Sequence, residues 1–231
     1  MKRGIMALSL LLGAPAAADG ALERVLDPDE LGEWSAVGRV NMAGRGFCTG
    51  ALVAPDLVVT AAHCLYHPVS GRRLAPDRLH FVAGQIRETW LADAGGQAVA
   101  HGAEQWREDR RFDVALLQLD APLELAPYAV AAGSSGADVA VASYARGRAF
   151  AMAVQEPCGV LQEVRGLLVL SCLAGPGTSG APVFARGTNG GLELIGVISG
   201  RAERPQGPVT IAVPVNAQVL DRLKAELSEA G

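Results

Sequence analysis

Short apolar runs separated by glycine and proline make up most of the chain. These runs are rich in Val, Leu and Ala, and runs of this length between turn-forming residues are typical of β-strands. Strands are expected at residues 36–40, 48–53, 57–60, 79–83, 98–102 and 114–119, and again at 139–144, 159–164, 167–172, 182–185, 192–199 and 209–213. A stretch rich in Pro, Ala and Gly, residues 121–136, separates the two groups. The pattern therefore predicts an all-β protein of two antiparallel six-stranded β-barrels with a cleft between them.

The two ends of the chain follow other patterns. Apolar residues near the C-terminus recur at spacings of three and four, which predicts a C-terminal amphipathic α-helix within residues 216–231. The N-terminus has Lys2 and Arg3, then an apolar run, residues 5–12, and then small residues up to Ala18. This is the pattern of a secretory signal. The apolar run is too short to span a bilayer, and no later run approaches the ~20 apolar residues that a span requires.

The patterns together give an expected organisation. Residues 1–18 are a signal peptide, 19–32 an N-terminal extension or propeptide, 33–125 the first barrel, 126–215 the second barrel and 216–231 the C-terminal helix. Cleavage after Ala18 would leave 213 residues (231 − 18), secreted or periplasmic and without a membrane span. An N-terminal core helix is the alternative interpretation of residues 1–18.

The composition excludes some partners. Twenty basic against 24 acidic residues give a formal net charge of −4, and there is no run of Lys or Arg. A nucleic-acid binder carries a basic patch or stripe, so no nucleic-acid partner is expected.

Export changes the interpretation of the four cysteines, because an even number in an oxidising compartment indicates disulfides. Pairing Cys48 with Cys64 and Cys158 with Cys172 closes the shortest loops, although three pairings are formally possible. A zinc site is the alternative, but the sequence has neither CxxC nor a spaced His pair. Two disulfides and no metal site are therefore expected.

Three local motifs carry candidate chemistry. They are TAAHC at residues 60–64, DVALLQL at 113–119 and GTSGAP at 177–182. A serine hydroxyl is a weak nucleophile at neutral pH, and it needs a base in hydrogen-bond reach and a buried carboxylate to orient that base. His63, Asp113 and Ser179 supply these three groups. Because they are 50 and 66 residues apart in sequence, they can act together only if folding brings them to one cleft.

With these motifs the sequence resembles a trypsin-like, chymotrypsin-fold serine protease, and within that family the bacterial glutamyl endopeptidase-like branch. CTGALVAPDLVVTAAHC resembles the family's first cysteine, strand and histidine, and GTSGAPVF followed by IGVISG resembles its nucleophile loop and next strand. The order His, Asp, Ser is also that of the family. The resemblance covers residues 33–215.

The resemblance implies a role for each residue. Ser179 would attack the scissile carbonyl, His63 would act as general base and then acid, and Asp113 would orient the imidazole. The backbone N–H groups of Gly177 and Ser179 would form the oxyanion hole. Ser199 and Gly200 would pair with the substrate backbone.

The sequence also departs from the family. Many members pair a new N-terminus, often IVGG, with an aspartate just before the nucleophile; here that position is Thr178 and no IVGG is present. Activity is therefore expected without this ion pair, although cleavage between Arg24 and Val25 is a second possibility. Leu173, six residues before the nucleophile, would lie at the base of the specificity pocket. Ile198 stands where the glutamyl branch has histidine, so a neutral, small or apolar P1 residue is expected.

The expected function is that of an exported serine endopeptidase that cleaves protein or peptide substrates through an acyl-enzyme. It is expected to be a monomer and to need no cofactor. Two alternatives remain open: a non-catalytic binding protein on the same fold, and an esterase that uses the same triad.

Overall fold

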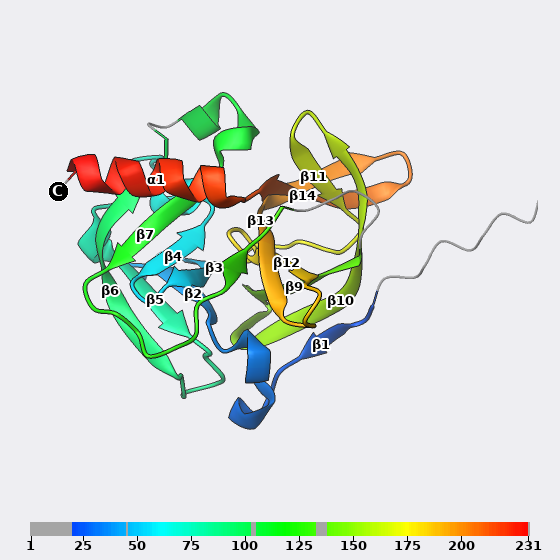
Figure 1. Cartoon of the computed structure of the whole chain (residues 1–231), viewed down its shortest axis with the longest axis horizontal. Helices are drawn as coiled ribbons and strands as arrows, with labels where there is room; N and C mark the ends of the chain where they lie inside the picture. Colours follow the sequence, from blue (N-terminus) through cyan, green and yellow to red (C-terminus); the bar gives the residue numbers. More distant parts are fainter. Residues whose placement is uncertain (1–19, 45, 103–104, 133–137, 231) are drawn as a thin grey trace, which may run out of the picture.

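The computed structural model describes residues 20–44, 46–102, 105–132 and 138–230. The expected signal, residues 1–18, lies outside the described residues, as do residues 133–136 of the expected linker. The described residues form two β-barrels that lie side by side, with one long helix across the first barrel (Figure 1). Within the described ranges, none of the helices combines the length and the apolar character needed to cross a membrane.

The first barrel is closed and consists of six antiparallel strands in the order β2-β3-β4-β7-β6-β5. Its strands are β2 (Val37–Met42), β3 (Phe47–Ala54), β4 (Leu57–Thr60), β5 (Leu79–Ala83), β6 (Ala92–Ala100) and β7 (Ala115–Leu119). The barrel closes because β2 pairs with β5 as well as with β3.

The second barrel is a ring of six strands in the order β9-β10-β11-β14-β13-β12, closed by pairing of β10 and β12 with β9. Its strands are β9 (Asp138–Ala145), β10 (Arg148–Val164), β11 (Leu167–Leu170), β12 (Pro182–Arg186), β13 (Leu192–Arg204) and β14 (Gly207–Pro214). Two short strands extend it: β1 (Leu22–Arg24) pairs with β10, and β8 (Ala129–Val130) lies parallel to β13.

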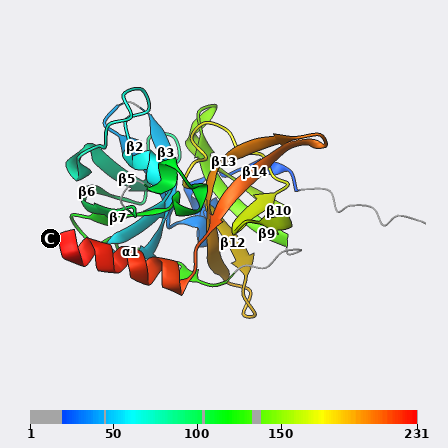
Figure 2. The ribbon, with the colours of Figure 1, turned by 90° about the horizontal axis from the view of Figure 1, so that it is seen from above.

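The remaining elements are one α-helix and several 3₁₀ turns. The turns are η1 (Pro28–Glu30), η2 (Gly32–Trp34), η3 (Ala62–Leu65), η4 (Pro76–Arg78), η5 (Gln105–Arg107) and η6 (Arg110–Phe112). The helix α1 (Ala217–Ala230) buries Leu220, Leu223 and Leu227 as its spacing predicts, and it packs on β6 and β7 (Figures 1 and 2). Asn216 caps it, since its Oδ1 accepts from the Val219 N–H.

A shared core joins the two barrels, since one cluster of buried residues draws on the strands of both. At the boundary, the Tyr128 ring lies 4.5 Å from the Phe184 ring, and Trp34 contacts the same phenylalanine at 5.9 Å. The Tyr144 hydroxyl of β9 donates to the Gln85 carbonyl of the first barrel. The cleft walls are therefore fixed relative to each other by apolar packing and by hydrogen bonds.

The expected fold class is confirmed, while several strand limits are wrong. β6 begins six residues before the expected start at 98, because the glycine pair that suggested a turn is part of the strand. A Cβ on Gly96 would lie 2.4 Å from the Pro76 carbonyl, so glycine there allows η4 to pack on the strand. The first half of β10 was missed because Pro157 reads as a break, whereas it lies at an irregularity in the pairing with β9, where proline is tolerated.

Candidate active site

His63 and Asp113 form the best-defined pair in the cleft. The His63 Nδ1 lies 2.8 Å from Asp113 Oδ2 and 3.0 Å from Oδ1, and the His63 backbone N–H donates to Oδ1 at 2.9 Å. The carboxylate is nearly buried, with 5% of its side chain exposed, whereas 29% of the His63 side chain is exposed. The buried acid therefore holds both the ring and the backbone of a histidine whose other edge faces the cleft.

Local structure explains why these two residues meet. His63 lies in η3, directly after β4, and the Cys48–Cys64 disulfide ties this turn to β3. Asp113 ends η6 just before β7, which pairs with β4. Neighbouring antiparallel strands thus bring the end of one segment beside the start of the other.

Ser199 is a third group on the same carboxylate. Its hydroxyl, from β13 of the second barrel, donates to Asp113 Oδ2 at 2.5 Å. Burial alone would raise the pKa of the Asp113 carboxyl, but the hydrogen bonds from His63 and Ser199 outweigh it, so the pKa is lowered. Asp113 therefore stays ionised at neutral pH. The sequence assigned Ser199 to substrate binding only and gave no signal for this second contact.

Ser179 lies in the turn that precedes β12, and the backbone of this turn packs directly against the histidine segment. A Cβ on Gly180 would lie 2.1 Å from Thr60 Oγ1 and 3.0 Å from the Ala61 backbone nitrogen. Gly180 also has φ of +78°, so both space and conformation require glycine. The Ser179 carbonyl accepts from the Thr49 N–H at 2.8 Å, which ties the turn to β3.

Hydrogen bonds orient the two backbone N–H groups assigned to the oxyanion hole. In a planar trans peptide the N–H points away from the carbonyl of the preceding residue. The Pro176 carbonyl accepts from Arg146 N–H at 2.8 Å, and the Thr178 carbonyl accepts from Ala181 N–H at 3.0 Å. The Gly177 N–H therefore points away from the Pro176 carbonyl, and the Ser179 N–H points away from the Thr178 carbonyl. Neither N–H donates to another group within the described ranges.

Two threonine hydroxyls hold this loop. The Thr178 hydroxyl donates to the Gly175 carbonyl at 2.7 Å and accepts from the Gly175 N–H, which closes the loop on itself. The Thr49 hydroxyl, from β3, donates to the Gly177 carbonyl at 2.9 Å and accepts from the Tyr144 N–H. Both side chains are buried. The sequence named position 178 as a departure from the family but gave no sign of Thr49.

The structure brings the remaining candidates together only in part. No hydrogen bond joins Ser179 to His63 within the described part of the chain. Ser199 borders a hollow of about 490 Å³ beside His63, lined also by Trp106 and Arg110. A Cβ on Gly200 would lie 3.7 Å from an Arg110 Nη1. Leu173, expected at the base of the specificity pocket, is 68% exposed and is not among the residues that line this hollow.

The cysteines form disulfides rather than metal ligands. Cys48 is bonded to Cys64 and Cys158 to Cys172, the pairing that the short loops favoured. Among the described residues, the one group with the spacing of a metal site is Cys48, His63 and Cys64. Both of its sulfurs are in the disulfide, and a disulfide sulfur cannot serve as the thiolate ligand that zinc needs.

Two barrels that each contribute part of the cleft define the chymotrypsin fold, and the His63–Asp113 pair of the first barrel meets Ser199 of the second barrel there. The sequence matches the trypsin-like peptidase domain over residues 48–197. The chain therefore belongs to the trypsin-like peptidase family, as its sequence resemblance implied.

Curated relatives agree over shorter stretches. A trypsin from Saccharopolyspora erythraea is 32% identical over 102 residues, which are 41% of this chain and 40% of that protein. A modular serine protease from Drosophila melanogaster is 33% identical over 86 residues, 34% of this chain and 14% of that protein. The chain thus matches less than half of the length of these relatives.

A solved structure supports the fold over nearly the whole chain. The structure of a Glu endopeptidase in complex with MPD superposes with a TM-score of 0.75, covering 92% of this chain and 98% of that one. The two sequences are 16% identical, so this likeness concerns the fold alone.

Proposed function

We propose that the protein is an exported serine endopeptidase that hydrolyses peptide bonds through an acyl-enzyme. The observation that carries the proposal is the bonding of Asp113, which accepts from the His63 ring and backbone and from Ser199 while the Ser179 turn packs on the segment leading to His63. An ionised, buried carboxylate that bonds a histidine in this way supports the role of Asp113 as the acid that orients the base.

The proposed reaction uses the same groups in both halves. Ser179 Oγ attacks the scissile carbonyl and its proton passes to His63 Nε2, while Asp113 stabilises the imidazolium through Nδ1. The oxyanion binds the N–H groups of Gly177 and Ser179. His63 then gives its proton to the leaving amine, and a water molecule, activated by His63, hydrolyses the acyl-enzyme and restores the Ser179 hydroxyl.

A neutral P1 residue is part of the proposal. Position 173 carries a leucine, so a P1 Arg or Lys finds no carboxylate there. Ile198 is buried and apolar and offers nothing to a P1 Glu. We expect small or apolar P1 residues to be cleaved fastest, and efficient cleavage confined to Arg, Lys or Glu peptides would contradict this.

No activation cleavage is needed for the proposed site. The oxyanion loop is held by hydroxyl and backbone hydrogen bonds that exist in the described chain. The second possibility, cleavage between Arg24 and Val25, concerns a bond within a paired segment, because Arg24 is in β1 and the Val25 N–H donates to the Met152 carbonyl. We propose removal of residues 1–18 on export as the one processing step.

Labelling with a fluorophosphonate tests the proposal. The protein without residues 1–18 is expected to be labelled, and Ser179→Ala is expected to lose labelling, while Ser228→Ala, a change on the exposed face of α1, keeps it. Hydrolysis of a peptide library by the same preparations then distinguishes a peptidase from an esterase, which would turn over ester substrates alone. Absence of labelling in a folded protein would instead indicate a non-catalytic binding protein.

A further inference from the structure

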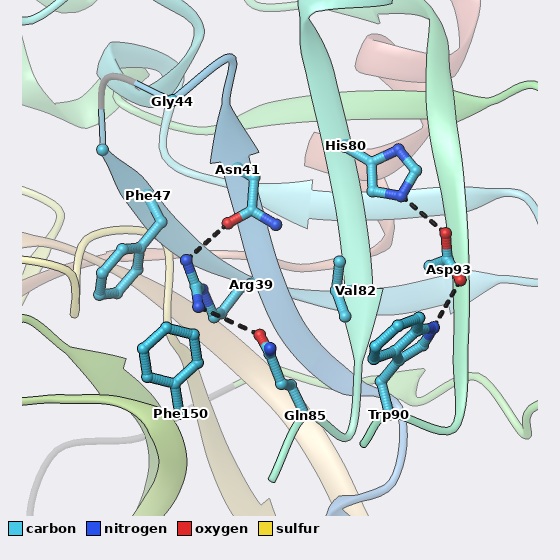
Figure 3. Close-up of a pocket in the computed structure, with 11 residues that line it drawn as sticks. Arg39, Asn41, Gly44, Phe47, His80, Val82, Gln85, Trp90, Asp93 and Phe150 are labelled. Carbon is cyan, nitrogen blue, oxygen red and sulfur yellow. Dashed lines mark hydrogen bonds and ion pairs between the residues drawn. The ribbon is translucent and has the colours of Figure 1, made fainter. Parts of the chain in front are cut away.

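A groove separate from the residues described above crosses the first barrel. It has a volume of about 520 Å³ and runs over β2, β5 and β6, with Phe150 of β10 from the second barrel at its border (Figure 3). At one end Arg39 lies between two phenylalanine rings, and at the other His80, Trp90 and Asp93 form a connected group. Trp90 is 52% and Phe150 57% exposed, so large apolar surfaces face solvent along it.

The Arg39 guanidinium has only neutral partners among the described residues. Its Nη1 donates to the Gln85 side chain at 3.1 Å and to the Ala149 carbonyl at 3.0 Å, and its Nη2 donates to the Asn41 side chain at 2.8 Å. Its Nε is buried without a partner in the described part of the chain. Burial lowers the pKa of Arg39, which reflects poor solvation of its charge. A cation in this situation gains most from an added carboxylate.

The rings beside Arg39 fix its position. Its guanidinium carbon lies 4.3 Å from the centre of the Phe47 ring and 5.3 Å from that of Phe150. Stacking between rings keeps the plane of the guanidinium in place, so little side-chain entropy remains to be lost when a ligand binds. The arginine is thus a preformed element of the groove, unlike a flexible surface side chain.

At the other end of the groove, the Asp93 carboxylate is bonded to residues other than Arg39. Asp93 accepts from Trp90 Nε1 at 2.6 Å through Oδ1, and its Oδ2 lies 2.7 Å from His80 Nε2. Figure 3 shows this group across Val82 from Arg39. Both oxygens of Asp93 therefore have partners at that end of the groove, and the positive charge of Arg39 remains available to a ligand.

The groove borders the proposed active site on the leaving-group side. Phe47 separates the two: its ring packs on Arg39, and a Cβ on Gly177 would lie 2.6 Å from Phe47 Cε2. Cys48, the next residue, lines a hollow beside His63 that does not include Ser199 among its lining residues. The acyl half of a substrate is assigned to Ser199 and Gly200, so the Phe47 side is left for the half that departs.

We propose that this groove binds the part of a polypeptide substrate that follows the scissile bond, and that Arg39 selects an Asp or Glu side chain there. The proposal rests on the proposed endopeptidase function. An extended chain advances about 3.3 Å per residue, and the Phe47 ring contacts both Arg39 and the Gly177 turn, so the groove begins within a few residues of the cleaved bond. The exposed rings of Phe150 and Trp90 would cover the aliphatic and aromatic parts of the same segment.

Internally quenched peptides test the proposal. A peptide that the protein cleaves is made with Glu or with Gln, which has the same shape without the charge, at each of the second to fifth positions after the scissile bond. We expect kcat/KM to be about tenfold higher for Glu at one of these positions, the ratio typical of one charge-assisted hydrogen bond. Equal values at every position would overturn the proposal.

The key variant is Gln85→Glu, which places a carboxylate of nearly the same shape at the existing 3.1 Å contact with Arg39. This internal partner should reduce the Glu-to-Gln ratio to about one without removing the arginine. Arg39→Gln should do the same, with folding checked by thermal unfolding. Gln218→Glu, at an exposed position of α1 outside the groove, makes the same charge change and should keep the ratio. If Gln85→Glu keeps the wild-type Glu-to-Gln ratio of kcat/KM, Arg39 does not recognise the charge of the substrate residue and the proposal is overturned.

A short substrate separates this proposal from the proposed function. An acyl p-nitroanilide has no residues after the scissile bond, so all groove variants should hydrolyse it as the wild type does. Failure of the wild type to hydrolyse both the anilide and the peptides would overturn the proposed function, and this proposal with it. Cleavage of both without a charge preference would overturn the groove proposal alone.

Discussion

The two walls of the cleft hold their candidate catalytic residues by different kinds of interaction. On the first barrel, an ionised carboxylate bonds His63 and a disulfide ties the histidine turn to β3. On the second barrel, neutral hydroxyls and backbone groups hold the Gly177–Ser179 turn, and one of the hydroxyls, that of Thr49, belongs to the first barrel. The histidine is thus placed by its own barrel, whereas the nucleophile loop depends on contact between the barrels.

This difference separates two requirements of the proposed reaction. The charge of Asp113 acts on the proton transfer, because it fixes the tautomer of the imidazole and stabilises the imidazolium. The hydroxyl of Thr49 acts on the geometry of the oxyanion loop and carries no charge. Changes on the two sides should therefore differ in size and in their dependence on pH.

The largest effect is expected from Asp113→Asn. An amide in this place favours the wrong tautomer of His63, and kcat should fall by about 10⁴ while the fold is retained. Steady-state kinetics and a thermal unfolding curve measure the two effects. Asp109→Asn is the matched control, because Asp109 is the acid four residues away and its bonds are to Arg111. Near wild-type activity in Asp113→Asn would contradict the role of Asp113 in orienting His63 and stabilising its imidazolium.

A smaller effect is expected from Thr49→Val, which keeps the shape of the side chain and removes the hydrogen bond to the Gly177 carbonyl. Loss of a buried hydrogen bond typically corresponds to about 1–3 kcal/mol, so kcat should fall about 5- to 150-fold with little change in KM. Thr49→Ser retains the hydroxyl and should restore most of the rate. If both variants lose activity and stability together, the hydroxyl supports the fold and not the loop.

The smallest effect concerns the contact between the walls. Tyr144 and Tyr128 donate to the carbonyls of Gln85 and Glu33, and burial raises the pKa of both phenols. A raised pKa in the folded state means that stability is fully present below the unfolded value of about 10 and declines as pH rises above it. Denaturant unfolding from pH 8 to 11 should show this decline, and Tyr144→Phe should reduce its slope. Constant stability up to pH 11 would contradict the assignment.

Much of the fold was accessible from the sequence because its signals are local. Short apolar runs separated by turn-forming residues predicted the barrel strands, and the spacing of Leu220, Leu223 and Leu227 predicted the helix. The failures occurred where tertiary contact overrides a local signal. From the sequence alone Gly96 indicates a turn, whereas in the fold it lets η4 pack on β6. Pro157 indicates the end of a strand, whereas it lies at an irregularity in the β9–β10 pairing.

The candidate site divides in the same way. The histidine, aspartate and serine were accessible because each lies in a motif of its own, and the order of the motifs pointed to one family. Thr49 and Arg146 were not, since a buried threonine in a strand and a backbone N–H at the end of β9 carry no sequence signal. The double role of Ser199 likewise depends on a distance between two barrels, which no local pattern contains.

The C-terminal helix has a consequence for the order in which the protein can mature. Glu226 of α1 accepts hydrogen bonds from the backbone N–H groups of His101 and Gly102, on the segment that leads to Trp106 beside His63. During synthesis this carboxylate emerges long after all the residues assigned to catalysis. The hydrogen bonds that hold this part of the cleft wall therefore form only when the chain has been made through residue 226 and α1 has docked.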